Sequence, residues 1–315
     1  RAAMPNENET AKYPSAIGNP SRIPSQNTLR LNCMDSFILY TILSPVFIIA
    51  QGQRKRKSRA IFFCFAMLTP AASYSTMKVK GVFSMNRDAI KMLAMLTMLL
   101  NHIANALLPA GQPLTNLFLF IGYFTAVTMC YFLVEGYGRT RSKRNYAARL
   151  LVFALLAQLP YQLAFPEYGM AGFVQFNMLF TLLLCFLVLL VQEQVHDRVL
   201  RGICIVLLIC ASLFCDWALL APIFTLLFSW AKDAPARKKA AFAAAALLYG
   251  GMAGLGSGSL ADALGCAVPI LVSGFVLLYL YNGRRAVRGR TFYKWFFYAF
   301  YPAHLLILGL LRLLA

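Results

Sequence analysis

Two histidines inside long apolar stretches are the residues of this sequence best suited to chemistry. His102 lies in LLNHIANALL and His304 lies in FYAFYPAHLL, and the chain has only three histidines. An ionisable side chain inside an apolar segment is a functional candidate, because its burial costs free energy unless it is paired. Imidazole also takes up and releases a proton near neutral pH. Both residues are therefore candidates for acid–base chemistry. The third, His196, lies in a charged loop, where we expect it to be solvated.

Four further polar residues are predicted to lie near the same level as these histidines. His102 lies about 13 residues into its apolar run, or ~20 Å from the start of the run at the helical rise per residue. Similar counting gives comparable depths for Gln158, Asn177 and Asp216, while Asn101 directly precedes His102. Any one such amide often serves only as a hydrogen-bonded joint between membrane helices. Convergence of several at one depth favours a functional site.

The elements that must position these residues are apolar runs of helix length. Nine runs occur after Met85, at 89–108, 114–134, 147–164, 172–191, 199–214, 217–231, 240–253, 263–281 and 292–314. A helix needs ~20 residues to cross a bilayer, and these runs lack the period-two alternation of a membrane barrel. The sequence therefore predicts an all-α polytopic bundle with about nine transmembrane helices, some of them short.

Composition supports a membrane protein. Of the 315 residues, 60% are hydrophobic and 13% are charged, against roughly 25% charged residues in a soluble domain. The net charge is +19, which in other chains indicates nucleic-acid binding. Here the basic residues lie in short loops between apolar runs, so no nucleic-acid partner is expected. The eight cysteines include no C-x-x-C pair, and no metal site is predicted.

Basic residues alternate from loop to loop. The loops at 138–149, 232–239 and 282–290 carry five, four and four Lys or Arg residues, while PAGQP, FPEYGMAG, FCDW and GGMAGLGSGSLAD carry none. Basic loops stay on the cytoplasmic side of a membrane. We therefore expect a multi-pass protein of a bacterial cytoplasmic membrane with its C-terminus outside.

The first 84 residues differ from the rest. They open with a polar stretch rich in Pro, Asn and Ser, followed by two apolar stretches that are each shorter than a full span. Such a composition is typical of disorder. We expect residues 1–84 to be an N-terminal extension, with Met77 or Met85 as alternative starts and residues 1–76 dispensable, and residues 85–315 to form the membrane domain.

The inner ends of the helices carry a second candidate cluster. Glu135 is followed by Arg139 and Arg141, and the loop at 282–290 adds Arg284 and Arg285. Such residues often serve only to set the orientation of a membrane protein. Arginines also bind phosphate groups well, so the cluster is a candidate site for a phosphorylated cytosolic ligand.

The order and spacing of several segments resemble the TraX family of integral membrane proteins. The segments are AIKMLAMLTMLLNHIA, IGYFTAVTMCYFLVEGYGRTRSKRNYAARLLVFALLAQLPYQLAF, FNMLFTLLLCF, DWALLAPIF, LLYLYNGRR and KWFFYAFYPAHLLIL. The family is named after a protein that N-acetylates conjugative pilin. It usually has Asp where this chain has Asn101, and Arg and Pro where this chain has Tyr123 and Val127, which suggests a divergent branch. The resemblance covers roughly 85–315.

A looser resemblance is to membrane acyltransferases of the acyltransferase-3 type. In that family a basic residue precedes a histidine by the spacing seen here between Lys91 and His102. The resemblances imply transfer of an acetyl group from cytosolic acetyl-CoA to an acceptor outside. Lys91 and four arginines would bind the acyl-CoA: Arg139, Arg141, Arg284 and Arg285.

The chemistry of such a transfer suggests roles for the polar residues inside the membrane. His102 would act as general base, oriented by Asp216 or Asn101, with His304 holding the carbonyl oxygen or sharing the proton. Hydrogen bonds to the oxyanion or the acceptor would come from Asn177 and Gln158. Asn101 and Glu135 are further candidates for substrate binding.

The acceptor itself stays open, between a protein N-terminus and a glycan or polymer of the cell envelope. A transporter or flippase, or a non-catalytic assembly factor of a secretion or conjugation system, are the alternative functions. A transporter would more often show an internal repeat, and we find none between the two halves of this sequence.

Overall fold

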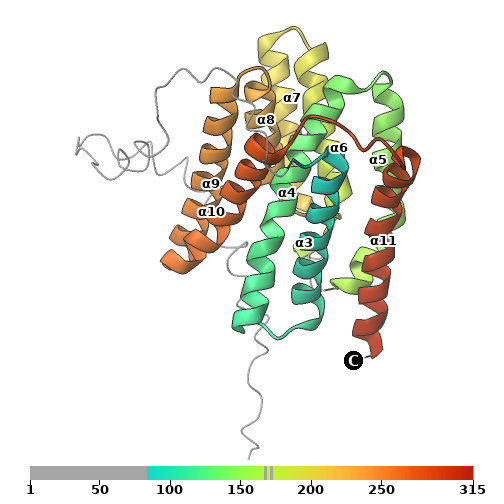
Figure 1. Cartoon of the computed structure of the whole chain (residues 1–315), viewed down its shortest axis with the longest axis vertical. Coiled ribbons are helices and arrows are strands. Elements are labelled where there is room, and N and C mark those ends of the chain that lie inside the picture. Colours follow the sequence, from blue (N-terminus) through green and yellow to red (C-terminus); the bar gives the residue numbers. More distant parts are fainter. Residues whose placement is uncertain (1–83, 167–168, 171–172, 315) are drawn as a thin grey trace, which may run out of the picture.

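The computed structural model describes residues 84–166, 169–170 and 173–314. The predicted extension at 1–84 thus lies almost wholly outside the described residues and stays a prediction. Nine α-helices make up most of the described part (Figure 1): α3 Arg87–Leu107, α4 Pro113–Arg139, α5 Lys143–Ala164, α6 Met178–Gln194, α7 Arg198–Ala211, α8 Leu220–Ala231, α9 Pro235–Ser257, α10 Leu260–Phe275 and α11 Arg290–Leu314. Three small elements join them: a hairpin of β1 Gly169–Met170 and β2 Phe173–Val174, the 3-10 turn η1 Ser212–Phe214, and the π-helical turn η2 Val276–Leu280 that extends α10.

These helices coincide with the nine apolar runs, so the predicted all-α fold is confirmed. Six of them are long and apolar enough to cross a membrane: α3, α4, α5, α9, α10 with η2, and α11. The helices α6, α7 and α8 have 17, 14 and 12 residues. At 1.5 Å per residue the last two reach only about 21 and 18 Å, less than the ~30 Å of a bilayer core. The connection between α7 and α8 therefore turns back within the depth of the bundle.

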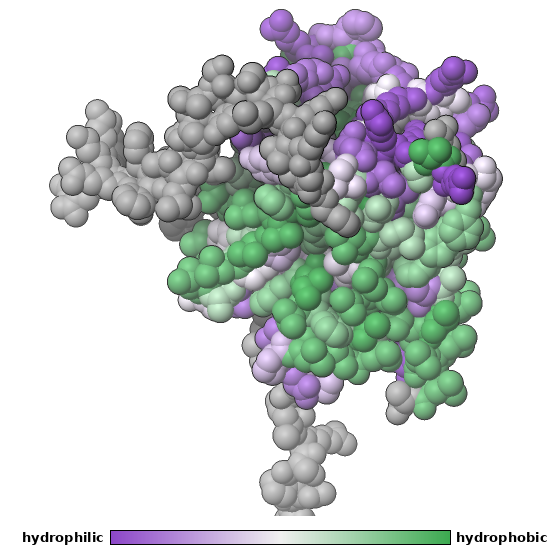
Figure 2. Space-filling model, in the orientation of Figure 1, coloured by the Kyte–Doolittle hydropathy of each residue, from purple (hydrophilic) through white to green (hydrophobic). Residues whose placement is uncertain are grey.

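Hydrophilic residues gather at one end of the bundle. The connections from α4 to α5 and from α10 to α11 both lie at the upper end in Figure 1, and the C-terminus lies at the lower end. Figure 2 shows hydrophilic residues over that upper end and a hydrophobic surface below it. These two basic connections thus lie at one end of the bundle and the C-terminus lies at the other, while the uncharged FCDW connection lies within the bundle. That the C-terminal end faces outward rests on the positive-inside rule and stays a prediction.

Local sequence signals begin several of these helices. The Asn86 side chain accepts a hydrogen bond from the Ala89 N–H at the start of α3, and Ser142 caps α5 in the same way. Such caps satisfy backbone N–H groups that have no partner inside the helix. At the start of α4 the first position is occupied by Pro113, which has no N–H to satisfy.

Close packing joins α3 to α4. A Cβ at Gly122 of α4 would lie 2.2 Å from Cβ of Asn101, so only glycine allows the two helices to approach this closely. The Thr125 hydroxyl on α4 donates to the Ala94 carbonyl on α3 at 2.6 Å. Together these contacts set the rotation of α3 about its axis.

The last helix returns to the first through backbone contacts. The Arg87 N–H donates to the Arg284 carbonyl at 2.8 Å, and the Asp88 carboxylate accepts from the Ala286 N–H at 2.7 Å. These bonds fasten the connection before α11 to the start of α3, and α11 then packs against α5 and α3. The fold thereby brings the two helices that carry His102 and His304 together.

Candidate functional site

His102 and His304 form a direct hydrogen-bonded pair. Nδ1 of His102 lies 2.8 Å from Nε2 of His304, the ring planes are 6° apart, and both side chains are buried. Nδ1 of His304 lies 2.8 Å from the carbonyl oxygen of Phe300, one turn earlier in α11. The edges of the Phe165 and Tyr301 rings pack against the His102 ring, with centroids 5.3 and 6.4 Å away. The pair is therefore held rigidly between α3, α5 and α11.

The hydrogen bonds of this pair determine which nitrogens carry protons. A carbonyl oxygen can only accept, so Nδ1 of His304 must carry a proton. When His304 is neutral, its Nε2 is then an acceptor, and Nδ1–H of His102 must donate to it. Neutral His102 is left with a lone pair on Nε2. Among the described residues none hydrogen-bonds that nitrogen. The arrangement thus presents His102 Nε2 as a base.

A cavity of about 1230 Å³ runs from the hydrophilic end of the bundle past His102. On α3 its wall follows one helical face, through Arg87, Lys91, Met95, Met98 and His102. His304 does not line the cavity and lies behind His102. The base therefore faces the cavity while its partner supports it from the protein side.

Charge is unevenly distributed along this cavity. Seven basic residues line its part nearest the hydrophilic end, namely Arg87, Lys91, Arg139, Arg141, Arg149, Arg285 and Lys294. Further in, the wall is mostly apolar and includes Met98, Met129 and Leu133. At the far end it reaches Pro109, Phe165 and Arg312. The cavity thus joins a basic mouth to the histidine and then to the opposite end of the bundle.

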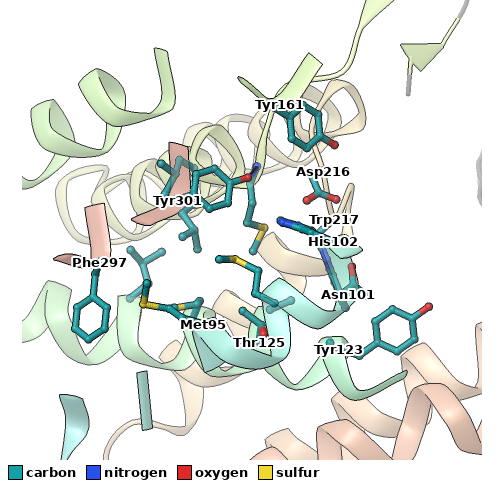
Figure 3. Close-up of a pocket in the computed structure, with 18 of the residues that line it drawn as sticks. Met95, Asn101, His102, Tyr123, Thr125, Tyr161, Asp216, Trp217, Phe297 and Tyr301 are labelled. Atoms are coloured by element: carbon teal, nitrogen blue, oxygen red, sulfur yellow. Dashed lines mark hydrogen bonds between the residues drawn. The ribbon is translucent and has the colours of Figure 1, made fainter. Parts of the chain in front are cut away.

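Asp216 lies in the connection between α7 and α8, at the level where that short helix pair turns back. Its backbone N–H donates to the Phe176 carbonyl at 2.8 Å, and its carbonyl accepts from the Thr181 hydroxyl. The next residue, Trp217, has a φ of 57°, a left-handed conformation that is strained for a bulky residue. Figure 3 shows Asp216, Trp217 and His102 facing the same space. The strained turn thereby directs a carboxylate and an indole into the cavity beside the base.

The TraX family model, described as TraX protein, matches residues 86–312. The chain belongs to the TraX family. It is also similar to a protein of Dichelobacter nodosus named "Probable fimbrial assembly protein FimC, serogroup H1". The two are 34% identical over 235 residues, which cover 70% of this chain and 92% of that relative. No solved structure matches this chain. The looser resemblance to acyltransferase-3 enzymes stays a prediction.

In this TraX-family protein His102 is oriented differently from our expectation. We expected Asp216 or Asn101 to orient the ring, but its hydrogen-bond partner in the described structure is His304. Asn101 instead donates to the Leu119 carbonyl at 3.0 Å and accepts from Asn105. Although Asn101 touches the cavity, these bonds make it a joint between α3 and α4. The reason is the rotation of α3 about its axis. Adjacent residues of a helix point about 100° apart, so Asn101 and His102 face different neighbours.

The amides Asn177 and Gln158 are not brought to the cavity. Asn177 is fully buried, caps α6, and donates to the Ala154 carbonyl at 2.8 Å and to Gln158 at 2.9 Å. Gln158 in turn donates to the Gln175 carbonyl at 2.8 Å. Their hydrogen-bonding groups are thus used to join α5 to the start of α6. The geometry favours the role of a helix joint over the expected contact with a substrate.

The residues predicted for the inner end divide into two groups. Lys91, Arg139, Arg141 and Arg285 line the basic mouth, whereas Arg284 and Glu135 do not. Glu135 forms an ion pair with Arg139 at 2.7 Å and accepts from the Tyr281 hydroxyl at 2.8 Å. The Glu135 carboxylate is therefore part of the wall that positions Arg139, and it lies far from the histidine pair.

Sequence reasoning missed several residues of the cavity wall. Tyr301 precedes His304 by three residues and so lies on the same face of α11, which helical spacing could have indicated. Its oxygen accepts from the Met178 backbone N–H at 3.2 Å, and Figure 3 shows its hydroxyl directed toward the space beside His102. Arg87 and Arg149 at the mouth gave no signal of their own, because basic residues near helix ends occur in every multi-span protein.

Proposed function

We propose that this protein is a membrane-embedded acetyltransferase that moves an acetyl group from cytosolic acetyl-CoA to an amine or hydroxyl acceptor at the opposite side of the membrane. One observation carries the proposal: a single cavity connects a basic mouth with the free nitrogen of a buried histidine. A membrane enzyme that joins a cytosolic donor to an external acceptor needs such a route.

The mouth suits the donor. Coenzyme A carries several phosphate groups on its nucleotide and a thioester at the end of a long, uncharged arm. Arginine and lysine bind phosphates, and seven of them line the mouth. The stretch between the mouth and His102 is lined largely by methionine and other apolar side chains. It matches the uncharged arm, so the thioester would lie beside His102.

The reaction uses His102 as general base. The acceptor nitrogen or oxygen attacks the thioester carbonyl carbon, and its proton passes to Nε2 of His102. A C–N or C–O bond forms, the C–S bond breaks, and the proton returns from His102 to the leaving sulfur. The products are the acetylated acceptor and coenzyme A as the thiol. His304 positions the base and stabilises the imidazolium, because it accepts the hydrogen bond from Nδ1–H.

Tyr301 is placed to stabilise the oxyanion that forms during this attack. Because its oxygen accepts from the Met178 N–H, its own O–H is available to donate. A preorganised donor near a developing oxyanion lowers the barrier substantially. Its ring packs edge-on against that of His102, with centroids 6.4 Å apart, and both residues line the same cavity, so one reacting group beside the two rings is within reach of both. Tyr301 replaces Asn177 and Gln158 as the expected donor.

The acceptor is proposed to be a protein of a surface fibre. The relative from Dichelobacter nodosus is named for fimbrial assembly, and acetylation of a fimbrial subunit would link that name to this site. The same name also favours the second candidate function, a non-catalytic assembly factor.

Labelled acetyl-CoA separates the two functions. Membranes that contain the protein are incubated with acetyl-CoA carrying label in the acetyl group, and label in protein and polysaccharide fractions is compared with the thiol released. With the wild type we expect equal amounts of transferred label and released thiol, both increasing with time. With His102→Ala we expect neither. Absence of both label and thiol release in wild-type membranes that retain fimbrial assembly would favour the assembly factor.

A further inference from the structure

Two arginines of the basic mouth hold buried N–H groups that have no acceptor in the described part of the chain. Nε and Nη1 of Arg87 on α3, and Nε of Arg149 on α5, are shielded from solvent and have no hydrogen-bond partner among the described residues. A buried charged donor without an acceptor is costly, and such a group in a native structure indicates a missing partner. Both side chains line the cavity, so that partner can arrive through the mouth.

Like charges are crowded around these two arginines. Arg87, Arg149 and Arg285 are all close enough to Tyr146 for their charges to act on its hydroxyl. Arg87 and Arg285 act in the same way on Lys91, which the carboxylates of Asp88 and Glu135 influence in the opposite direction. Four cations from α3, α5 and the connection before α11 thus surround one region. Two carboxylates offset part of the repulsion among these four cations, and an anion bound there would relieve the rest.

We propose that Arg87 and Arg149 form the binding site for the diphosphate of the donor substrate, with Lys91 and Arg285 beside them. This inference rests on the proposed function. Rotation about the last bonds of each side chain turns the guanidinium groups toward the cavity that they line. Each guanidinium can then bind phosphate oxygens through paired N–H groups.

The spacing along α3 fits this assignment. Lys91 and Arg87 precede His102 by 11 and 15 residues, which places them about 17 and 22 Å away along the helix. The arm of coenzyme A has thirteen bonds between its nearest phosphorus and the sulfur, so it spans roughly 15 Å at the reach per bond of an extended peptide. A diphosphate at the level of Lys91 leaves the thioester at His102, and Arg87 lies one further helical turn toward the mouth.

Phosphate chemistry is shared by two sources, a soluble diphosphate and the head group of an anionic lipid. The buried N–H groups of Arg87 and Arg149 face protein and cavity, and both arginines come from the inner wall of the bundle. We therefore assign the site to the soluble diphosphate, and the experiment distinguishes the two.

Calorimetric binding to the purified full chain in phosphatidylcholine nanodiscs tests the proposal. The probes are acetyl-CoA, S-acetyl-pantetheine, which lacks the diphosphate, and inorganic pyrophosphate. Arg87→Gln and Arg149→Gln should each raise the Kd for acetyl-CoA and for pyrophosphate about tenfold, as expected for a lost charge-assisted hydrogen bond. The Kd for S-acetyl-pantetheine should not change. Arg144→Gln is the matched control, because Arg144 is exposed and does not line the cavity.

The outcomes separate this site from the proposed function. If acetyl-CoA binds the wild type and both variants equally, the diphosphate site is overturned while the acetyltransferase stands. If the wild type binds pyrophosphate in an Arg87- and Arg149-dependent way but does not bind acetyl-CoA, the anion site stands and the donor is wrong. Loss of pyrophosphate binding in nanodiscs that contain phosphatidylglycerol would assign the site to lipid and overturn the proposal. Arg87→Lys, which keeps the charge, serves where Arg87→Gln does not fold, and it should weaken binding less.

Discussion

Replacing His304 tests whether the base depends on the ring behind it. His304→Ala removes the acceptor that lies 2.8 Å from Nδ1 of His102, although His304 itself does not line the cavity. His102 would lose both its fixed orientation and the proton position that leaves Nε2 free. A misplaced general base costs about as much as a missing one, so kcat should fall about 10²–10⁴-fold. The KM for acetyl-CoA should change little, because the basic mouth is untouched.

Two further variants make this test specific. His102→Ala should lower kcat by a similar factor, and the double variant should be little worse than either single one, because residues that serve one step are strongly non-additive. His304→Gln keeps an oxygen that can accept from Nδ1–H of His102. It should therefore recover much of the activity that His304→Ala loses.

The assay is thiol release from acetyl-CoA together with label transfer, in membranes with matched amounts of folded protein. Thermal unfolding in detergent controls for packing, since the His304 ring also stacks on Phe300 with centroids 4.9 Å apart. His196→Ala, in an exposed connection, is the silent control. Near-normal transfer by His102→Ala, or single losses that multiply in the double variant, would refute the reasoning and leave the histidines as a packing contact between α3 and α11.

Three other predictions follow from the same structure. Tyr301→Phe should lower kcat about 10²–10³-fold by removing the oxyanion donor, without weakening acetyl-CoA binding. Tyr161 is a second buried tyrosine of the cavity wall, and the kinetics of Tyr161→Phe should stay near normal. Equal kinetics for the two variants would contradict this prediction. Asn177→Ala should lower the free energy of unfolding by about 1–3 kcal/mol, because the Ala154 carbonyl and the start of α6 lose a buried partner. The activity per folded molecule should not change. A stable but inactive variant would show that Asn177 belongs to the functional site. A reporter enzyme that works only after export should be active when it is fused to the C-terminus, because the C-terminus lies at the end of the bundle opposite the basic connections. Activity of a reporter that works only in the cytosol would instead show that the C-terminus faces inward.

Positions of helices were predictable because hydropathy and charge are local properties of the chain. All nine apolar runs became helices, and the basic connections before α5 and α11 lie at the end of the bundle opposite the C-terminus. Depth was also predictable, because a helix advances 1.5 Å per residue whatever its neighbours are. This is why counting along the first and last apolar runs placed His102 and His304 at one level.

Only the tertiary structure decided which faces of the helices meet. The rotation of each helix about its axis depends on contacts with distant elements, such as the fit of Gly122 against Asn101 and the fastening of Asp88 to Ala286. Those contacts placed His304 behind His102, and they brought Tyr301 to the cavity wall. The amides of α5 and α6 were predicted at the right depth, but packing turned them toward each other. Depth follows from position in the sequence, whereas orientation is a property of the packed bundle, because side chains far apart in the chain must fill one interior together.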